Sequence, residues 1–350
     1  MLRCKVEKTK IGRRVLVGGL AGSVLLPYAP QKAATQWVDR ARLSDADSFA
    51  ADIQQLNSLS ISVKSEIHLA AAYRGPGLNT PVNVKSVSKT LLATLVLIAI
   101  DRGIIASVSE PILPLLGDFA PKSGLKPWVE NITVDHLLSM RSGLARTSGP
   151  EYGAWVNSPN WVEYVLTGPA TAAPGTEMNY STGDYHLLSA ILTNVTGRST
   201  HELAQSWLGD PLEAEMPPWT RDPQGIYMGG NNMAISPNGM RRFGEMALAG
   251  GVHNGTRIIS EDMLRAAWTP RARSPYSGHQ YGYGWFQTLM SGVRVFYARG
   301  YGGQMIYVIP QRDTVVVMTS DANLPARSNG HGGVLNRLLS EKILPAISRA

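Results

Sequence analysis

A continuous apolar segment after residues 86–89 is the feature that most restricts what this chain can fold into. Residues 90–100 read TLLATLVLIAI and carry no charge. An apolar run of this length is typical of a helix that is buried inside the molecule. Gly103 follows the run, and glycine commonly lies just beyond the end of a helix. The sequence therefore predicts a buried helix that begins near Ser86.

Ser86 and Lys89 lie at the start of this predicted helix. Residues three apart share a helix face, so we expect the lysine amine beside the serine hydroxyl. A free serine hydroxyl is a poor nucleophile, and a neighbouring base activates it. The Ser-x-x-Lys pattern alone occurs by chance about once in a chain of this length. A second copy, from Ser123 to Lys126, is expected in a loop because Pro127 follows it, so the helical context favours Ser86 as the nucleophile.

The composition is typical of a globular protein. The chain has 350 residues, of which 44% are hydrophobic and 17% charged, and this length suggests one large domain or two closely packed ones. Seven of the 33 basic and one of the 26 acidic residues lie within residues 1–34, so most of the net charge of +7 belongs to that segment. The nearly neutral remainder carries no nucleic-acid-binding motif, and we expect no nucleic-acid partner.

Residues 1–34 have the order of a bacterial export signal. A basic stretch ends at Arg13-Arg14, an apolar stretch follows, and small residues come next. The paired arginines are typical of a twin-arginine signal, so we expect a periplasmic or secreted protein with no stable membrane insertion after signal removal. A basic tail or an uncleaved anchor is the alternative. Cys4, the one cysteine, lies in this segment, so the exported chain would hold no disulfide.

The sequence lacks the motifs of several kinds of enzyme. The seven histidines form no H-E-x-x-H pair, and neither a G-x-S-x-G elbow nor a phosphate-binding loop occurs. We expect no metal and no cofactor. His136 lies in a predicted helix, 133–140, and is expected to be a structural histidine with Thr133 as the helix cap.

The hydrophobic period changes along the chain. Partial alternation predicts strands over residues 61–73, after a weakly amphipathic helix at 48–56. Helices joined by Pro- and Gly-rich loops are then expected at residues 133–140, 161–166, 184–197, 200–208 and 237–249. The last third is rich in β-branched residues, and it is expected to form strands at 293–297, 305–309 and 314–318, followed by a helix at 334–347.

This order of elements predicts an α/β (α+β) fold. An antiparallel sheet flanked by helices would carry an all-helical inserted subdomain, with a cleft between the two. Residues 35–85 and 230–350 are expected to form the α/β subdomain, and residues 86–229 the mainly helical one.

Tyr180 is the second candidate for chemistry. It lies in the segment 179–185, between a Pro-Gly turn and an apolar helix, and can point into a cleft. Beside a lysine ammonium its pKa is expected to fall, so that it could accept the serine proton and return it to the leaving group. The chain has 13 tyrosines, and an ordinary packed tyrosine is the alternative.

The third candidate is a glycine cluster between two predicted strands, at residues 298–304. Gly300 and Gly302 either form a bulge or let the backbone approach a substrate closely. In the second case the backbone N–H groups of Ser86 and Tyr301 form an oxyanion hole, which is commonly the largest single catalytic contribution.

Together and in this order, the three segments resemble the serine β-lactamase and penicillin-recognising DD-peptidase superfamily. The resemblance extends over nearly the whole chain after residue 34 and is nearest to class C-like esterases and 6-aminohexanoate-dimer hydrolases. It implies a β-lactamase/transpeptidase-like fold with Ser86 as nucleophile and Lys89 as proton acceptor. It further implies Tyr180 as acid and base, and the backbone of Tyr301 as an oxyanion donor.

Two departures from the family pattern bear on the substrate. Thr182 stands where the Tyr-x-Asn motif has asparagine, and Arg299 lies in Ala-Arg-Gly where the family has Lys-Thr-Gly. Thr182, Arg299, Gly300 and Gly302 are the expected substrate-binding residues. Without the asparagine and the lysine, an ester or simple amide is favoured over a penicillin or a cell-wall peptide.

The sequence thus predicts a serine hydrolase that cleaves a small ester or amide through an acyl-enzyme on Ser86. One alternative is a DD-carboxypeptidase or class C-like β-lactamase. The other is a non-catalytic binder of peptides or cell-wall ligands. Four aromatic residues of the helical middle either line an apolar acyl pocket or pack between loops; these are Trp128, Tyr152, Trp155 and Trp161.

Overall fold

The computed structural model describes residues 37–326 and 328–347. The expected export signal, residues 1–34 with Cys4, lies outside the described residues, and export remains a prediction. A compact unit begins at Gln36. In the described part of the chain, no helix has the length and apolar character needed to cross a membrane.

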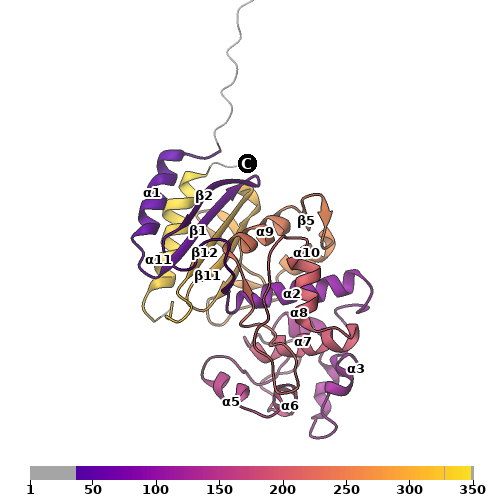
Figure 1. Ribbon diagram of the computed structural model, residues 1–350. Helices are drawn as coiled ribbons and strands as arrows, with labels where there is room; N and C mark the ends of the chain where they lie inside the picture. Colours follow the sequence, from indigo (N-terminus) through magenta and orange to yellow (C-terminus); the bar gives the residue numbers. More distant parts are fainter. Residues whose placement is uncertain (1–36, 327, 348–350) are drawn as a thin grey trace, which may run out of the picture. The chain divides into compact units, whose positions relative to one another are not determined.

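An antiparallel sheet of eight strands joins the two ends of this unit (Figure 1). The order is β2-β1-β12-β11-β10-β9-β8-β7, so the first strand, β1, pairs with the last one, β12. The central strands β11 and β12 are buried along their whole length, as their continuous apolar sequences require. The strands are β1 (Leu56–Val63), β2 (Glu66–Ala72), β7 (Ala272–Arg273), β8 (Gln280–Tyr281), β9 (Phe286–Met290), β10 (Val293–Gly300), β11 (Gln304–Ile309) and β12 (Thr314–Ser320).

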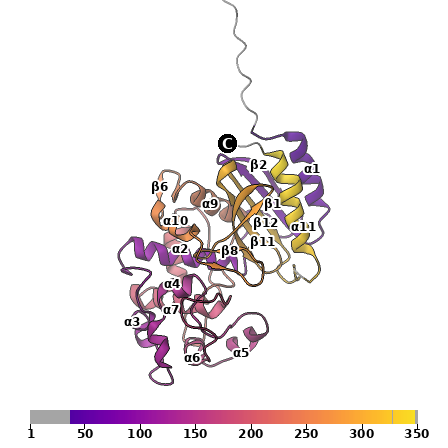
Figure 2. The ribbon, with the colours of Figure 1, turned by 180° about the vertical axis from the view of Figure 1, so that it is seen from behind.

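Helices cover both faces of the sheet, as Figures 1 and 2 show from opposite sides. One face is covered by α1 (Arg40–Ala51) together with the C-terminal helical segments, which are α11 (His331–Arg337), η6 (Leu338–Ile343) and α12 (Leu344–Ala346). The other face is covered by α2 (Val87–Asp101), α9 (Pro237–Leu248) and α10 (Glu261–Trp268). A small hairpin of β5 (Val252–His253) and β6 (Thr256–Arg257) follows α9.

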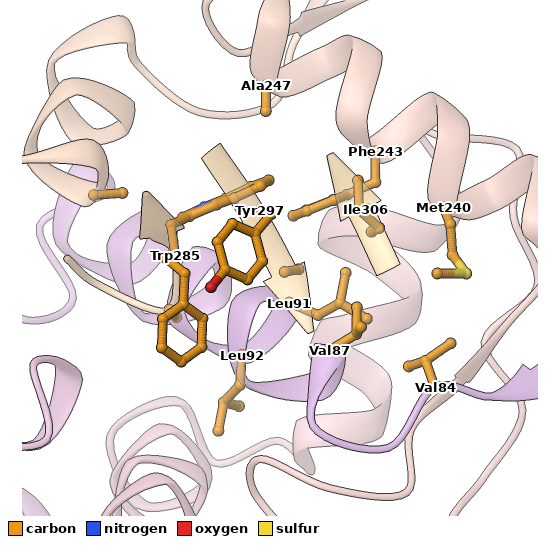
Figure 3. Close-up of a cluster of buried hydrophobic side chains, with 14 of the residues drawn as sticks. Val84, Val87, Leu91, Leu92, Met240, Phe243, Ala247, Trp285, Tyr297 and Ile306 are labelled. Atoms are coloured by element: carbon orange, nitrogen blue, oxygen red, sulfur yellow. The ribbon is translucent and has the colours of Figure 1, made fainter. Parts of the chain in front are cut away.

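The predicted buried helix is α2. Every residue from Val87 to Ala99 is buried, and Gly103 beyond its end adopts the left-handed conformation. In Figure 3, Val87 and Leu91 lie among Phe243 of α9 and Ile306 of β11. The helix also contacts the helical half of the molecule through α7 and α8, so it links the sheet to that half.

The helical half consists of short helices around α7 (Thr182–Thr196), which contacts α2, α3, α4 and α6. As predicted, Thr133 caps α4: its hydroxyl accepts from the N–H of His136, whose ring accepts from the N–H of Thr133. The other elements are α3 (Ile112–Leu116), η1 (Gly117–Phe119), η2 (Pro127–Asn131), α4 (Val134–Leu138), η3 (Gly149–Glu151), α5 (Tyr152–Val156), α6 (Trp161–Thr167), α8 (Thr200–Ala204) and η4 (Gln205–Gly209).

The predicted fold class is confirmed. The first helix, however, lies at other residues than those predicted. The first helix is α1, not residues 48–56, because the Asp39 carboxylate caps it by accepting from the N–H groups of Ala41 and Arg42. Leu56 instead begins β1 and pairs with Ser320 of β12. That pairing joins residues far apart in sequence, so local periodicity could not predict it.

Candidate active site

Ser86 lies in a turn between a short strand and α2. The strand β3 (Val82–Asn83) pairs with β4 (Ala234–Ile235), which brings the segment before Ser86 next to residues 230–235. Lys85 has a φ of 50°, an unfavourable left-handed conformation for a side-chain-bearing residue. Ser86 is the N-cap of α2, yet its side chain makes no capping hydrogen bond. The half-buried hydroxyl therefore remains available to other groups.

Lys89 is buried directly beside that hydroxyl. Its Nζ lies 3.2 Å from the Ser86 Oγ, 3.2 Å from the Thr182 Oγ1 and 2.6 Å from the carbonyl oxygen of Gly230. A neutral amine has two hydrogens and one lone pair. Thr182 and Gly230 can accept the two hydrogens, which leaves the lone pair for the proton of Ser86. Burial lowers the pKa of Lys89 to about 7, so a large share of the amine is neutral at physiological pH.

Asp184 is a buried carboxyl group that the sequence analysis did not single out. It lies in the first turn of α7 and has no exposed surface. Burial raises its pKa to about 8, and its charge, where present, favours the protonated form of Lys89. An aspartate in an otherwise apolar helix was the signal that could have revealed it.

Tyr180 meets the same hydroxyl from the helical half. Its side chain shares a hydrogen bond with Ser86, and the Lys89 Nζ lies 4.9 Å from the centroid of its ring. The prediction that its pKa falls was wrong: burial raises the pKa of Tyr180 to about 12, against the opposing effects of Ser86, Arg299 and Arg146. The group is thus a neutral phenol at physiological pH and a proton donor. Serine, lysine and tyrosine converge at one place.

Thr182 holds the lysine and is closed off from solvent. Its Oγ1 lies 2.9 Å from the Ser148 Oγ, which also accepts the N–H of Thr182. Its side chain is therefore engaged with Lys89 and Ser148, and only 4% of the residue surface is exposed. Thr182 was expected to contact substrate; its hydroxyl lies against Lys89 and Ser148, and a contact with substrate stays a prediction.

The end of β10 comes close to the Ser86 turn because residue 300 is glycine. A Cβ atom there would lie 2.3 Å from the carbonyl oxygen of Val84. Among the described residues, the N–H groups of Ser86 and Tyr301 have no hydrogen-bond acceptor. Two such groups can bind a carbonyl oxygen, as an oxyanion hole requires.

Two hollows adjoin β10 and meet at Arg299. One, of about 320 Å³, is lined by Tyr276, His279 and Tyr297 as well as Arg299. The other, of about 540 Å³, is lined by the predicted substrate-binding segment from Arg299 to Gly302. Arg299, Gly300 and Gly302 therefore line one hollow, and their contact with substrate stays a prediction.

The carbonyl of Gly230 is positioned by a buried pair that consists of a histidine and an aspartate. The His186 Nε2 lies 3.0 Å from the Asp222 Oδ2, and the His186 Nδ1 accepts the N–H of Gly229. Neither His186 nor Asp222 has exposed side-chain surface. In the described part of the chain, no group of three metal-ligating residues occurs.

Two of the four aromatic residues considered for an acyl pocket, Trp155 and Trp161, are buried in the core of the helical half. Trp155 and Trp161 are buried, pack against each other and lie at 5.6 Å and 5.3 Å from the His186 ring. Both therefore have a packing role, here between helices, which agrees with the second of the two interpretations for these two residues.

Solved structures that share this fold include the following three. A Bacillus anthracis protein assigned as a 6-aminohexanoate-dimer hydrolase is 16% identical with a TM-score of 0.67, and the match covers 84% of this chain and 82% of that chain. A D-stereospecific amidohydrolase from Streptomyces sp. is 19% identical with a TM-score of 0.65, covering 87% and 99%. A family VIII carboxylesterase is 19% identical with a TM-score of 0.63, covering 85% and 96%. At these identities the likeness shows the fold.

The family model described as Beta-lactamase matches residues 53–339, which is most of the chain. The chain therefore belongs to the β-lactamase family. The resemblance inferred from the sequence is confirmed for family and fold, and the chain is placed among β-lactamase-like hydrolases.

Proposed function

We propose that the protein is a serine hydrolase that cleaves a carboxylic ester or simple amide through an acyl-enzyme on Ser86. The observation that carries the proposal is the Lys89 amine: it is buried, its pKa is lowered to about 7, and it lies 3.2 Å from the Ser86 Oγ. A neutral amine at hydrogen-bond distance is a general base poised for pH 7.

In the first step the Ser86 oxygen attacks the substrate carbonyl carbon while Lys89 accepts the hydroxyl proton. The N–H groups of Ser86 and Tyr301 stabilise the resulting oxyanion. The phenol of Tyr180 protonates the departing alcohol or amine as the bond to the carbonyl carbon breaks. Tyr180 then regains a proton from the Lys89 ammonium, so the site is again neutral.

In the second step water attacks the ester formed on Ser86. Lys89, which is a neutral amine again, accepts a proton from this water, and the Ser86 oxygen leaves and takes up a proton from the resulting Lys89 ammonium. The products are a carboxylic acid and the free enzyme. The same groups thus serve in both directions of proton transfer.

The surroundings of Thr182 support an ester or simple amide as substrate. Its hydroxyl is engaged with Lys89 and Ser148, and residue 182 has no side-chain amide that could hold an acylamide group. A carboxylesterase and an amidohydrolase are among the proteins of the same fold.

The test is hydrolysis of p-nitrophenyl butyrate by the purified protein. Ser86→Ala should reduce turnover by at least about a thousandfold, because the nucleophile is lost. Ser123→Ala is the matched control, since it removes the serine of the second Ser-x-x-Lys sequence in an exposed loop. Intact-protein mass after rapid quenching should show one acyl group, mapped to Ser86. Full activity of Ser86→Ala would refute the assignment.

A penicillin-interactive enzyme is the second candidate, and the family match favours it. Rapid turnover of nitrocefin, or stable labelling by a fluorescent penicillin without ester turnover, would replace the esterase or amidase proposal. Failure of every ester, amide and lactam to acylate Ser86 would instead favour a non-catalytic binder.

A further inference from the structure

The turn that carries the Tyr301 N–H joins β10 to β11 and contains two glycines in succession. The N–H of Gly303 donates to the carbonyl of Gly300 at 3.3 Å, across Tyr301 and Gly302. Gly302 and Gly303 have φ values of 81° and 103°, which a residue with a side chain rarely adopts. Since successive glycines make a backbone flexible, the direction of the Tyr301 N–H depends on contacts from outside the turn.

Gln55, in the segment between α1 and β1, makes such a contact. Its Nε2 donates to the carbonyl of Gly302 at 3.1 Å, and also to the carbonyls of Leu324 and Pro325 at 3.2 Å and 3.3 Å. The group has two hydrogens for three acceptors, so at least one hydrogen is shared. One side chain therefore joins the turn to the loop that follows β12.

The side-chain amide of Gln55 is itself held in one orientation. Its Oε1 accepts from the Nδ2 of Asn329 at 2.8 Å, and the backbone carbonyl of Gln55 accepts from the N–H of Asp321 at 3.0 Å. Only 8% of the residue surface is exposed. If the amide turned over, its oxygen would face three carbonyl oxygens, and a buried polar group without a partner is destabilising. The Nε2 therefore has one favourable position.

A second contact holds the next carbonyl of the turn. The Ser320 Oγ donates to the carbonyl of Gly303 at 3.3 Å, and the His331 Nε2 lies 3.0 Å from the same Oγ. Since the one hydrogen of this hydroxyl goes to Gly303, the imidazole Nε2 is the donor to Ser320. Burial lowers the pKa of His331, so its ring is neutral at physiological pH. The carbonyls of Gly302 and Gly303 are thus both held from outside the turn.

We propose that Gln55 is a positioning residue for the oxyanion hole: by holding the Gly302 carbonyl, it directs the Tyr301 N–H towards the reacting carbonyl oxygen. The proposal rests on the hydrolase function proposed above. Gln55 acts through the turn and not through contact with substrate. This role explains why a polar side chain is buried just before β1, where an apolar one would cost less to desolvate.

The test removes the amide and keeps the length of the side chain. Gln55→Met loses the bond to Gly302, and Gln54→Met is the matched control because Gln54 is the exposed neighbour in the chain. In Gln55→Met, kcat and kcat/KM for p-nitrophenyl butyrate should fall together by at least about tenfold, since an oxyanion donor acts in the transition state. The control should stay within about twofold of the unchanged protein.

Two further measurements separate positioning from a general loss of structure. The acid limb near pH 7 reports Lys89 and should not move in Gln55→Met. The inhibition constant of 1-butaneboronic acid should rise by the factor by which kcat/KM falls, because its adduct on Ser86 places an oxygen in the oxyanion hole. Thermal melts set an assay temperature at which each variant is folded.

Asn329→Asp tests the same contact from the surface, in case Gln55→Met does not fold. Residue 329 is exposed, and an aspartate keeps the acceptor for the N–H of His331. It places a carboxylate oxygen against the Gln55 Oε1, which favours an overturned amide that releases Gly302. We expect kcat to fall by about threefold or more while KM and the acid limb stay unchanged. An unchanged kcat in this variant would overturn the proposal.

The outcomes separate the role of Gln55 from the proposed function. Ser86-dependent hydrolysis with equal kcat in folded Gln55→Met and Gln54→Met would overturn that role and leave the hydrolase intact. A loss of kcat with a displaced acid limb, or with an unchanged boronate constant, would also overturn it, since the effect would then not come from the oxyanion hole. Hydrolysis that survives Ser86→Ala, or none by the unchanged protein, would overturn both.

Discussion

At the scale of single residues, burial determines which group acts as base and which as acid. Lys89 and Tyr180 both lie next to Ser86, and burial disfavours the charged form of each. For an amine the neutral form is the base, whereas for a phenol the neutral form is the acid. The same physical effect therefore prepares Lys89 to accept a proton and Tyr180 to donate one.

The pH dependence of ester hydrolysis should report the protonation of the Lys89 amine. Because its pKa is lowered to about 7, kcat/KM for p-nitrophenyl acetate should fall about tenfold per pH unit below that value, as the amine becomes protonated. Tyr180→Phe should be slower but keep this acid limb. An acid limb that disappears in Tyr180→Phe would assign the base to the tyrosine instead.

The buried amine should also make stability depend on pH. Between about 7 and 10.5 the unfolded Lys89 binds a proton and the folded one does not, so the free energy of unfolding should rise with pH by up to about 1.4 kcal/mol per unit. Lys89→Met lacks this contribution. Urea unfolding of both proteins from pH 7.5 to 9.5 measures the difference in slope. Parallel curves would contradict a lowered pKa.

At the scale of elements, the loop before β4 places the lysine. His186 of α7 holds Gly229, and the next residue, Gly230, presents its carbonyl to Lys89. Gly230 has a φ of 76°, and a Cβ there would lie 3.0 Å from the Lys89 Cγ and 2.7 Å from the Tyr185 Cβ. Only glycine fits this position without moving the lysine.

Gly230→Ala should therefore reduce kcat by at least about tenfold through displacement of Lys89. Gly225→Ala is the matched control, because Gly225 has a similar φ of 87° and open space around its Cβ position. In both variants backbone strain should lower the free energy of unfolding by about 1 kcal/mol or more. Urea unfolding measures this loss. Equal activities of the two variants would show that the carbonyl of Gly230 does not position the base.

At the scale of the whole molecule, the two ends of the described chain close the fold. The N–H of Asp39 donates to the carbonyl of Ala346, and Val38 bridges to Ile347. Leu43 and Ala46 of α1 are buried on this side of the sheet. The first helix is thus part of the core that carries the distant active site.

Two truncations should show that the stability of the fold depends on α1 and not on the segment before it. Removal of residues 1–35 should leave the Tm within about 2 °C and preserve ester hydrolysis, since the compact unit begins at Gln36. Removal of residues 1–51 also deletes α1 and exposes the apolar surface beneath it, so cooperative unfolding should be lost. Circular-dichroism melts measure both. A stable, active protein without α1 would contradict this account.

The sequence by itself determined the buried helix, its serine and lysine on one face, the order of the three segments, and hence the fold and family. The helix and its shared face follow from local periodicity and short spacing, whereas the family follows from the resemblance that the three ordered segments carry. Only the tertiary structure decided that Tyr180 is a neutral phenol, that Thr182 lies against the Lys89 amine, and that the Gly230 carbonyl accepts from it. The reason is physical: desolvation and hydrogen-bond partners come from segments far apart in sequence, which meet only when the chain has folded.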